Sequence, residues 1–348
     1  MKRKNTYNIM LVLICAFLFS SYLCFAKSDE SKTIKHQYGV YSVRFSPDGK
    51  YLAIAGGQSI LLYDMERNKL AKRWRPNFWI YAMDYAPDGE KIAVGGTTMG
   101  IPIYKLKTIR RPSKNLISGT VNFLDFSPDG RWLAAKNWGK PNAIVFDLTN
   151  NKKITFKLSP GRSWLSPRVQ FSPNGRLFAA AGDPVIMWEV GSWRERGKLK
   201  GTDLSIAFSP SSLTLAVGTL NSNGEITFWR TSTGTKRLSF RSKRIENSTY
   251  IEFSPGGHYL AVAGGKGQNF AVGSTIEIWH IKKKRIVKVL EGHTGTITTL
   301  DFSRDGKWLA SGSYDKTVRL WDVSTIADPS PKGVDATDKI ATTWGQVK

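Results

Sequence analysis

Side chains that could carry acid–base or metal chemistry are few and widely spaced in this sequence. The four histidines are His36, His258, His280 and His293. None of them stands at the spacing from carboxylates or cysteines that metal sites use, and the sequence contains no nucleophile elbow or phosphate-binding loop. We therefore expect no catalytic residue, no bound metal and no cofactor. Because the sites of some folds assemble from distant loops, an enzyme remains the alternative to a binding protein.

The cysteines, Cys15 and Cys24, lie in an N-terminal segment that is organised like a secretory signal. Cations at residues 2–4 precede a long apolar run, which ends at the small residue Ala26 and gives way to polar residues. We predict a signal peptide over residues 1–26, a secreted or periplasmic protein, and a mature chain without thiol chemistry. The alternative is an uncleaved anchor, because the run approaches membrane-spanning length. Contact with a membrane is expected only through this segment.

The charge balance of the chain is strongly basic. Lys and Arg number 51 against 27 Asp and Glu, which gives a net charge of +24 and a pI near 10.0. Such an excess favours an anionic partner, for example an acidic polysaccharide or a negatively charged surface. Nucleic acid is not expected as the specific ligand of an exported protein. The alternative is that the excess charge only keeps the protein soluble.

One short phrase recurs seven times along the chain. It consists of an aromatic residue, a small residue and then Pro-Asp-Gly, which is complete in three copies and varied in the other four. The aromatic residues of the seven copies are Phe45, Tyr85, Phe126, Phe171, Phe208, Phe253 and Phe302. Their separations are 40, 41, 45, 37, 45 and 49 residues, a period of about 43. A period of this size indicates one structural unit that is repeated seven times.

Each copy of the phrase predicts a hairpin. Pro fixes φ, Asp bonds nearby backbone and Gly accepts positive φ, so the phrase forms a tight turn between strands such as 41–45 and 51–55. A third strand ends in an aromatic 17 to 26 residues later, and a fourth segment is rich in β-formers and cations. Four short strands per repeat predict an all-β, seven-bladed propeller of four-stranded antiparallel blades over residues 27–326. We expect residues 327–348 to form a flexible C-terminal tail.

The last repeat carries the fullest set of polar residues. It contains Gly292-His293, Ser311, Asp315 and Trp321-Asp322. With these residues the sequence resembles the WD-repeat (Trp-Asp repeat) family, of the bacterial secreted type, over about residues 34–322. The resemblance implies a buried structural hydrogen-bond chain of His293, Ser311, Asp315 and Trp321. It implies little about function, because this fold serves many roles.

The resemblance also implies that the N-terminal strand closes the ring. No convincing fourth strand follows Trp321, and residues 29–37 precede the first hairpin. We predict that this segment pairs with the strand at 317–321.

Antiparallel order sorts the loops onto two faces. Connections between blades share one face, which we name the top face, with the loops between second and third strands, and the Pro-Asp-Gly hairpins lie on the bottom face. Loops of the top face place aromatic residues beside cations, which suits recognition of a protein or a carbohydrate. The candidate binding residues are Phe78, Trp79, Trp138, Lys140, Arg162, Trp164 and Phe270. The alternative is that Trp79 and Trp164 only plug the channel mouth.

Together these patterns predict an extracytoplasmic, monomeric scaffold that binds a protein or an anionic partner through its top face. The alternative function is a propeller hydrolase or lyase with a site at the central channel. Carboxylates or histidines converging on the channel would favour the enzyme, whereas aromatics and amides would favour binding. Cations cluster on the predicted outer strands, where they either protect sheet edges from aggregation or form a basic docking surface.

Overall fold

The computed structural model describes residues 31–97, 100–108, 112–117, 119–159, 168–199, 203–219, 224–265, 274–326 and 328. Two compact units divide the chain, Met1–Ser31 and Lys32–Lys348, and the described residues after Ser31 belong to the second. The predicted signal segment, residues 1–26, lies outside the described residues. Within the described part of the chain, no helix is long and apolar enough to cross a membrane.

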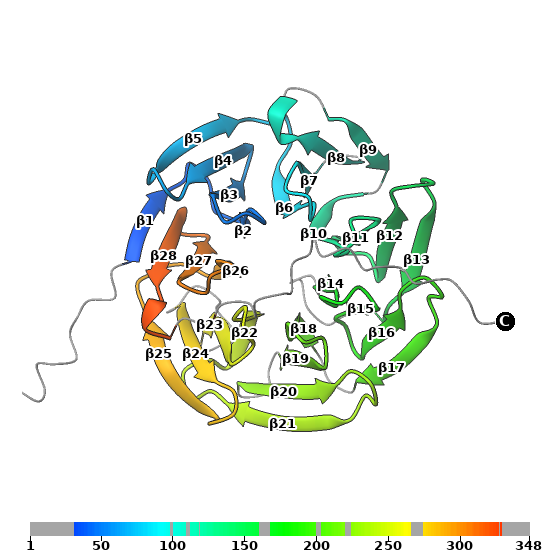
Figure 1. Cartoon of the computed structure of the whole chain (residues 1–348), viewed down its shortest axis with the longest axis vertical. Helices are drawn as coiled ribbons and strands as arrows, with labels where there is room; N and C mark the ends of the chain where they lie inside the picture. The colour runs from blue at the N-terminus through cyan, green and yellow to red at the C-terminus, as the bar shows by residue number, and fades with distance from the viewer. Residues whose placement is uncertain are drawn as a thin grey trace, which may run out of the picture. The chain divides into compact units, whose positions relative to one another are not determined.

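Across the described ranges, 28 strands form seven four-stranded antiparallel sheets, the blades, which follow one another around a ring (Figure 1). From the inner to the outer strand, blade 1 contains β2 (Ser42–Phe45), β3 (Tyr51–Gly56), β4 (Ser59–Asp64) and β5 (Lys69–Trp74). In the same order, blade 2 contains β6 (Ile80–Tyr85), β7 (Lys91–Gly96), β8 (Gly100–Lys105) and β9 (Lys114–Ile117). Blade 3 contains β10 (Val121–Phe126), β11 (Trp132–Asn137), β12 (Asn142–Asp147) and β13 (Lys153–Lys157).

The remaining blades are blade 4 with β14 (Val169–Phe171), β15 (Leu177–Ala180), β16 (Val185–Glu189) and β17 (Glu195–Leu199), blade 5 with β18 (Asp203–Phe208), β19 (Thr214–Thr219), β20 (Glu225–Arg230) and β21 (Lys236–Arg241), blade 6 with β22 (Asn247–Phe253), β23 (Tyr259–Gly265), β24 (Thr275–His280) and β25 (Arg285–Leu290), and blade 7 with β26 (Ile297–Phe302), β27 (Trp308–Ser313), β28 (Thr317–Asp322) and β1 (Ser31–Lys35). Two short 3-10 helices, η2 (Leu106–Thr108) and η3 (Ser324–Ile326), complete the described elements. The predicted fold, seven blades of four strands, is confirmed.

The recurring turn has the geometry that its residues dictate. In blade 1, the Gly49 amide donates to the Ser46 carbonyl at 2.8 Å, and Gly49 has a φ of 72°, which favours glycine. The Asp48 carboxylate accepts the Ser46 hydroxyl at 2.6 Å and the Lys50 amide at 3.1 Å. The turn of blade 1 therefore closes around one carboxylate, which fixes the register of its hairpin.

The ring closes through the N-terminal strand, as predicted. β1 pairs with β28 and supplies the outer strand of blade 7 (Figure 1). Just beyond β1, the His36 amide donates to the Lys316 carbonyl at 2.8 Å. Lys32 also contacts the hydroxyl of Tyr63 and the side chain of Asn68, which belong to blade 1. The last blade therefore contains both ends of the repeat array.

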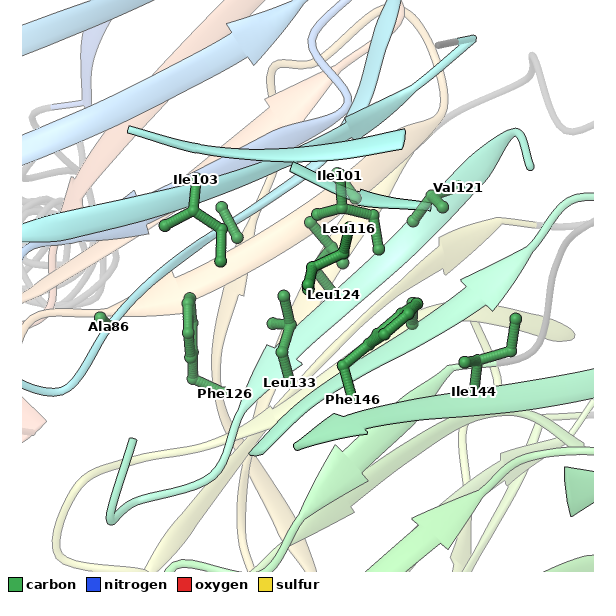
Figure 2. Close-up of a cluster of buried hydrophobic side chains, with 13 residues drawn as sticks. Ala86, Ile101, Ile103, Leu116, Val121, Leu124, Phe126, Leu133, Ile144 and Phe146 are labelled. Atoms are coloured by element: carbon green, nitrogen blue, oxygen red, sulfur yellow. The ribbon is translucent and has the colours of Figure 1, made fainter. Parts of the chain in front are cut away.

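The core lies between neighbouring blades. Between blades 2 and 3, Ile101 and Ile103 of β8 face Leu133 and Phe146 of β11 and β12, and all four are at most 5% exposed (Figure 2). Similar apolar clusters occur at the other blade junctions. Because each blade buries its faces only against its two neighbours, the stability of one blade depends on both of them.

Candidate functional site

Aromatic rings form a continuous row on the top face. Tyr314 of blade 7 contacts Tyr41 with ring centroids 5.3 Å apart, Tyr41 contacts Tyr81 at 5.0 Å, and Tyr81 contacts Trp138 of blade 3 at 5.6 Å. These four rings join blades 7, 1, 2 and 3. We name them the top-face aromatic strip.

A second ring pair lies on the same face. Tyr38, on the connection between β1 and β2, contacts Trp79, on the approach to β6, with centroids 5.5 Å apart. Trp79 is 42% exposed, close to the values of 45% for Trp138 and 44% for Tyr314. Large aromatic surface is therefore open to solvent at three places on one face.

Backbone hydrogen bonds hold the strip in place. In blades 3 and 7, the amides of Trp138 and Tyr314 donate to carbonyls of the incoming connections, those of Thr120 at 2.8 Å and Thr296 at 3.0 Å. In blade 2 the equivalent bond runs from the Thr97 amide to the Trp79 carbonyl at 2.9 Å. The same tie thus occurs in all three blades, so these aromatics sit on a repeated and rigid part of the framework.

Trp79 is fixed further by its neighbours in blade 2. Its amide donates to the Thr97 hydroxyl at 3.1 Å, which makes the contact between these residues reciprocal. A Cβ at Gly96 would lie 1.8 Å from the Trp79 carbonyl oxygen, so the close approach requires glycine there. The indole is therefore presented from a preorganised backbone.

A buried lysine supports the loop that carries Trp138. Lys136 is 3% exposed, and burial lowers the pKa of its ammonium group to about 8. Its Nζ donates to the Asn137 carbonyl at 3.0 Å and also to the Lys140 carbonyl. Lys136 is thus a positioning residue for the loop.

The hydroxyls of Tyr41 and Tyr314 stay protonated at neutral pH. Burial, together with the neighbouring Tyr41 and Tyr81, raises the pKa of Tyr314 to about 12. Burial also raises the pKa of Tyr41. Neutral hydroxyls can both donate and accept hydrogen bonds, so the strip combines apolar rings with polar groups.

The structure brings together part of the predicted binding set. Trp79, Trp138 and Lys140 are exposed on the top face. Phe78 is half-buried and packs against the apolar cluster between blades 1 and 2. Arg162, Trp164 and Phe270 lie outside the described residues.

The tyrosines of the strip were missed from sequence, although the repeat phase contains a signal for them. Tyr41 and Tyr81 each stand four residues before the aromatic of their phrase, and Trp138 and Tyr314 each stand twelve residues after it. Aligning the seven copies by phase, and then marking aromatics at equivalent positions, would have placed all four on one face.

The four polar residues of the last repeat form one chain of hydrogen bonds. His293 Nδ1 lies 2.7 Å from Asp315 Oδ2, and His293 Nε2 lies 2.8 Å from Ser311 Oγ. Trp321 Nε1 donates to the same hydroxyl at 2.8 Å. Burial lowers the pKa of His293 although Asp315 opposes this shift. The chain joins the entry to blade 7 with its second and third strands and has a structural role.

Carboxylates do converge on the central channel, but Asp84, Asp125 and Asp301 each accept a backbone amide of the next blade. Acceptor side chains on β6, β10, β14 and β26 receive the amide of the phrase aromatic in the following blade. The bonds run from Phe126 to Asp84 at 2.7 Å, from Phe171 to Asp125 at 2.6 Å, from Phe208 to Gln170 at 3.0 Å and from Phe45 to Asp301 at 2.6 Å. We call these bonds inner joints, and they assign the channel carboxylates to holding the ring together.

Two arginines balance the buried charge of the channel. Arg44 Nε lies 3.5 Å from Asp84 Oδ1, and Arg168 Nη2 lies 3.0 Å from Glu252 Oε2. Burial raises the pKa of Asp301 to about 7, while Arg44 acts in the opposite direction. Among the described residues, no group of three or more His, Cys, Asp or Glu side chains could hold a metal ion.

Cations of the outer strands form a separate surface. In β5 the residues from Lys69 to Arg73 are all exposed, as are Lys282 to Arg285 at the start of β25. Some outer-strand cations pair locally, such as Lys236 with Glu225 at 2.9 Å. These strands are sheet edges, where exposed charge discourages association with other edges.

Comparison with known proteins agrees with this architecture. The family described as "WD domain, G-beta repeat" matches residues 28–64 and 284–322, which include most of blade 1 and the last blade. A model of eukaryotic translation initiation factor eIF2A matches residues 200–291. With the seven-bladed fold, these matches support a WD-repeat protein.

Individual relatives are similar over part of their length. WD repeat-containing protein 18 of Homo sapiens is 30% identical over 236 residues, which cover 61% of this chain and 52% of that protein. The guanine nucleotide-binding protein subunit beta of Oryza sativa subsp. japonica is 27% identical over 226 residues, or 60% of this chain and 57% of that protein. The Periodic tryptophan protein 2 homolog of Schizosaccharomyces pombe is 33% identical over 106 residues, only 11% of its length. The chain thus spans from about a tenth to just over half of these relatives, which are all eukaryotic.

Proposed function

We propose that this protein is an interaction scaffold that holds a partner protein on its top face, at the top-face aromatic strip. The WD-repeat character supports a scaffold in general. The observation that carries the specific proposal is the unbroken contact of four aromatic rings from blade 7 to blade 3. No single blade could provide a surface of this length.

The strip has the physical properties of a protein-binding surface. Aromatic side chains bury a large area on binding and lose little rotamer entropy, which is why Tyr and Trp dominate binding hot spots. Here the backbone around Trp79 and Trp138 is already hydrogen-bonded, so ordering it on binding costs little further entropy. The neutral hydroxyls of Tyr41 and Tyr314 can pair with polar groups of the partner.

The basic net charge of the protein indicates the charge of its partner. A net charge of +24 attracts acidic molecules, and Lys140 is exposed two residues after Trp138. We propose an acidic partner protein, with an anionic polysaccharide as the second candidate. The N-terminal segment supports export, so the partner is proposed to be extracytoplasmic and the scaffold monomeric. An intact mass that matches a chain beginning at Lys27 would support export and cleavage. An intact mass that matches a chain with residues 1–26 would contradict them.

An enzyme at the central channel is the weaker proposal. Among the described channel carboxylates, Asp84, Asp125 and Asp301 each accept a backbone amide at 2.6–2.7 Å, and Glu252 pairs with Arg168 at 3.0 Å. Each of these carboxylates is therefore engaged by a group of the ring itself. Binding at the strip needs no such group.

Capture of the partner tests the proposal. The mature chain would be immobilised and exposed to extracellular and envelope extracts of its own source, beside Trp138→Ala and the control Leu213→Ala, an apolar residue that is 67% exposed on a bottom-face turn. We expect Trp138→Ala to weaken capture by roughly 30-fold, which corresponds to about 2 kcal/mol. Equal capture by Trp138→Ala, or equal loss with Leu213→Ala, would contradict a site at the strip.

A further inference from the structure

The bottom-face turns of most blades close on a carboxylate or amide of their own. The hydroxyls of Ser127 and Ser303 donate to Asp129 and Asp305 two residues later, at 2.5 and 2.6 Å. In blade 4, Ser172 donates in the same way to Asn174 at 2.8 Å. The backbone amide two residues beyond the acceptor donates to it as well, at 3.0–3.1 Å. A turn of this kind therefore needs one oxygen acceptor at a fixed place.

Blade 6 lacks the acceptor in its own turn. Gly256 stands where five of the other turns have Asp or Asn and the blade 5 turn has Ser211, so Ser254 has no partner at that position within the turn. Instead, Ser254 Oγ donates to Asp328 Oδ2 at 2.6 Å, and the His258 amide donates to the same oxygen at 2.8 Å. Asp328 thus makes, from 74 residues away, both bonds that a turn aspartate makes locally.

Two further contacts tie Asp328 to this turn. His258 Nδ1 lies 2.7 Å from Asp328 Oδ1, and the Gly256 amide donates to the Asp328 carbonyl at 2.8 Å. Asp328 is only 7% exposed. Both the side chain and the backbone of Asp328 are therefore held by the blade 6 turn.

The turn of blade 7 also accommodates this residue. A Cβ on Gly306 would lie 2.8 Å from the backbone of Asp328. At Gly89, Gly130 and Gly257 the nearest neighbour is instead the proline of the preceding turn, at 3.7, 3.6 and 3.3 Å. Asp328 therefore lies between the turns of blades 6 and 7. At the other three positions, this space is filled by the proline of the preceding turn.

We propose that the turn of blade 6 is a carboxylate-binding site, and that Asp328 of the C-terminal segment is its built-in ligand. The site takes an aspartate side chain through the Ser254 hydroxyl, the His258 amide and the His258 imidazole. It fastens the chain, just after η3, to the bottom face between blades 6 and 7. This assignment is independent of partner binding on the top face.

Substitution of Gly256 tests whether the site is specific for a carboxylate. Four of the other turns carry Asp at this position, and the positive φ falls on the next residue, Gly257, at 80°. Gly256→Asp should therefore fill the site from within the turn and displace Asp328. Gly197→Asp in β17 is the matched control, because a Cβ there meets nothing within 4 Å.

Cleavage by a protease that cuts before aspartate reports the displacement. The fragment that ends at Ala327 would be followed by mass spectrometry in the full mature chain. We expect slow cleavage in the wild type and in Gly197→Asp, and cleavage at least tenfold faster in Gly256→Asp. Fast cleavage in the wild type, or an unchanged rate in Gly256→Asp, would overturn the proposal.

Amide exchange at His258 provides the reciprocal test. In Asp328→Ala the His258 amide loses its acceptor, so its hydrogen exchange should accelerate at least tenfold. Adding Gly256→Asp to Asp328→Ala should restore slow exchange, because the new turn carboxylate accepts the same amide. If the double variant exchanges as fast as Asp328→Ala, or if Asp328→Ala leaves exchange unchanged, the turn does not bind a carboxylate as proposed.

Discussion

The carboxylate of Asp301 accepts the backbone amide of Phe45 at 2.6 Å, across the junction between the last blade and the first. The same junction is closed at the rim, where β1 pairs with β28. The seam of the ring is therefore joined twice, by a side chain near the axis and by a strand at the edge.

Asp301 should make stability depend on pH. Its pKa in the folded protein is about 7 because of burial, above its ordinary value of 3.8. The folded state therefore binds more protons than the unfolded state between these values, so this group's contribution to stability falls as pH rises from about 4 to 7, by on the order of 3 kcal/mol. Asp301→Asn, which keeps an oxygen acceptor as Gln170 does in blade 4, should remove that part of the pH dependence.

The measurement is urea unfolding at several pH values from 4 to 8, with Asp88→Asn as the exposed control. The difference in unfolding free energy between Asp301→Asn and the wild type should grow with pH. A constant difference would show that Asp301 titrates normally.

The hydrogen-bond chain of blade 7 should contribute measurably to stability. Asp315→Ala leaves His293 without its acceptor at Nδ1 and the Thr294 amide without its bond at 3.0 Å. We expect a loss of about 1–3 kcal/mol in the free energy of unfolding, measured by urea denaturation. Glu66→Ala, at an exposed position, should change it by less than about 0.5 kcal/mol. An effect of Asp315→Ala as small as the control would mean that the chain is energetically unimportant.

Removal of the N-terminal strand β1 should remove the strand pairing that closes the ring at its outer edge. A mature chain without residues 27–37 lacks β1 and exposes the edge of β28 to solvent. We expect the melting temperature to fall by at least about 5 °C, as followed by circular dichroism. Unchanged melting would imply that the inner joint of Asp301 is sufficient to close the ring.

Once a partner is captured, the salt dependence of its binding should distinguish the top-face aromatic strip from the cations of the outer strands. Trp138→Ala should weaken binding at every salt concentration, because the strip contributes apolar area. Lys282→Ala with Lys283→Ala should weaken it only at low salt, since exposed charges act mainly on association and are screened. Lys284 is left unchanged because it has a φ of 50°. If the lysine pair abolishes binding and Trp138→Ala does not, the partner binds the rim.

The fold could be predicted from sequence because a local signal was repeated. Each copy of the turn phrase fixes a hairpin by itself, and seven copies in phase leave little choice of architecture. The aromatics of the top face could be placed in part: Trp79 and Trp138 lie in loops and stood out, whereas Tyr41 and Tyr81 lie at the entry of inner strands, where aromatics usually belong to the core. Whether they bind a partner stays a prediction.

Long-range contacts had no local signal. Residues 327–348 were predicted to form a flexible tail; Asp328, the one residue of this segment that the structure describes, is buried against the turn of blade 6. The sequence signal was the lack of an aspartate at position 256. Nothing near Gly256 in the sequence indicates that Asp328 would accept the hydrogen bonds of the turn instead. The inner joints were missed for the same reason, since Asp84 bonds Phe126 in another repeat.

The inner joints have a direction, and this limits how the repeats can be recombined. The acceptor always belongs to one blade and the satisfied amide to the next, from Asp125 to Phe171 and from Gln170 to Phe208. A duplicated or transplanted blade would therefore bring its own acceptor side chain. The backbone amide of its phrase aromatic, however, would need an acceptor from whichever blade now precedes it. Engineered exchanges should transfer pairs of consecutive blades, so that at least one joint moves intact.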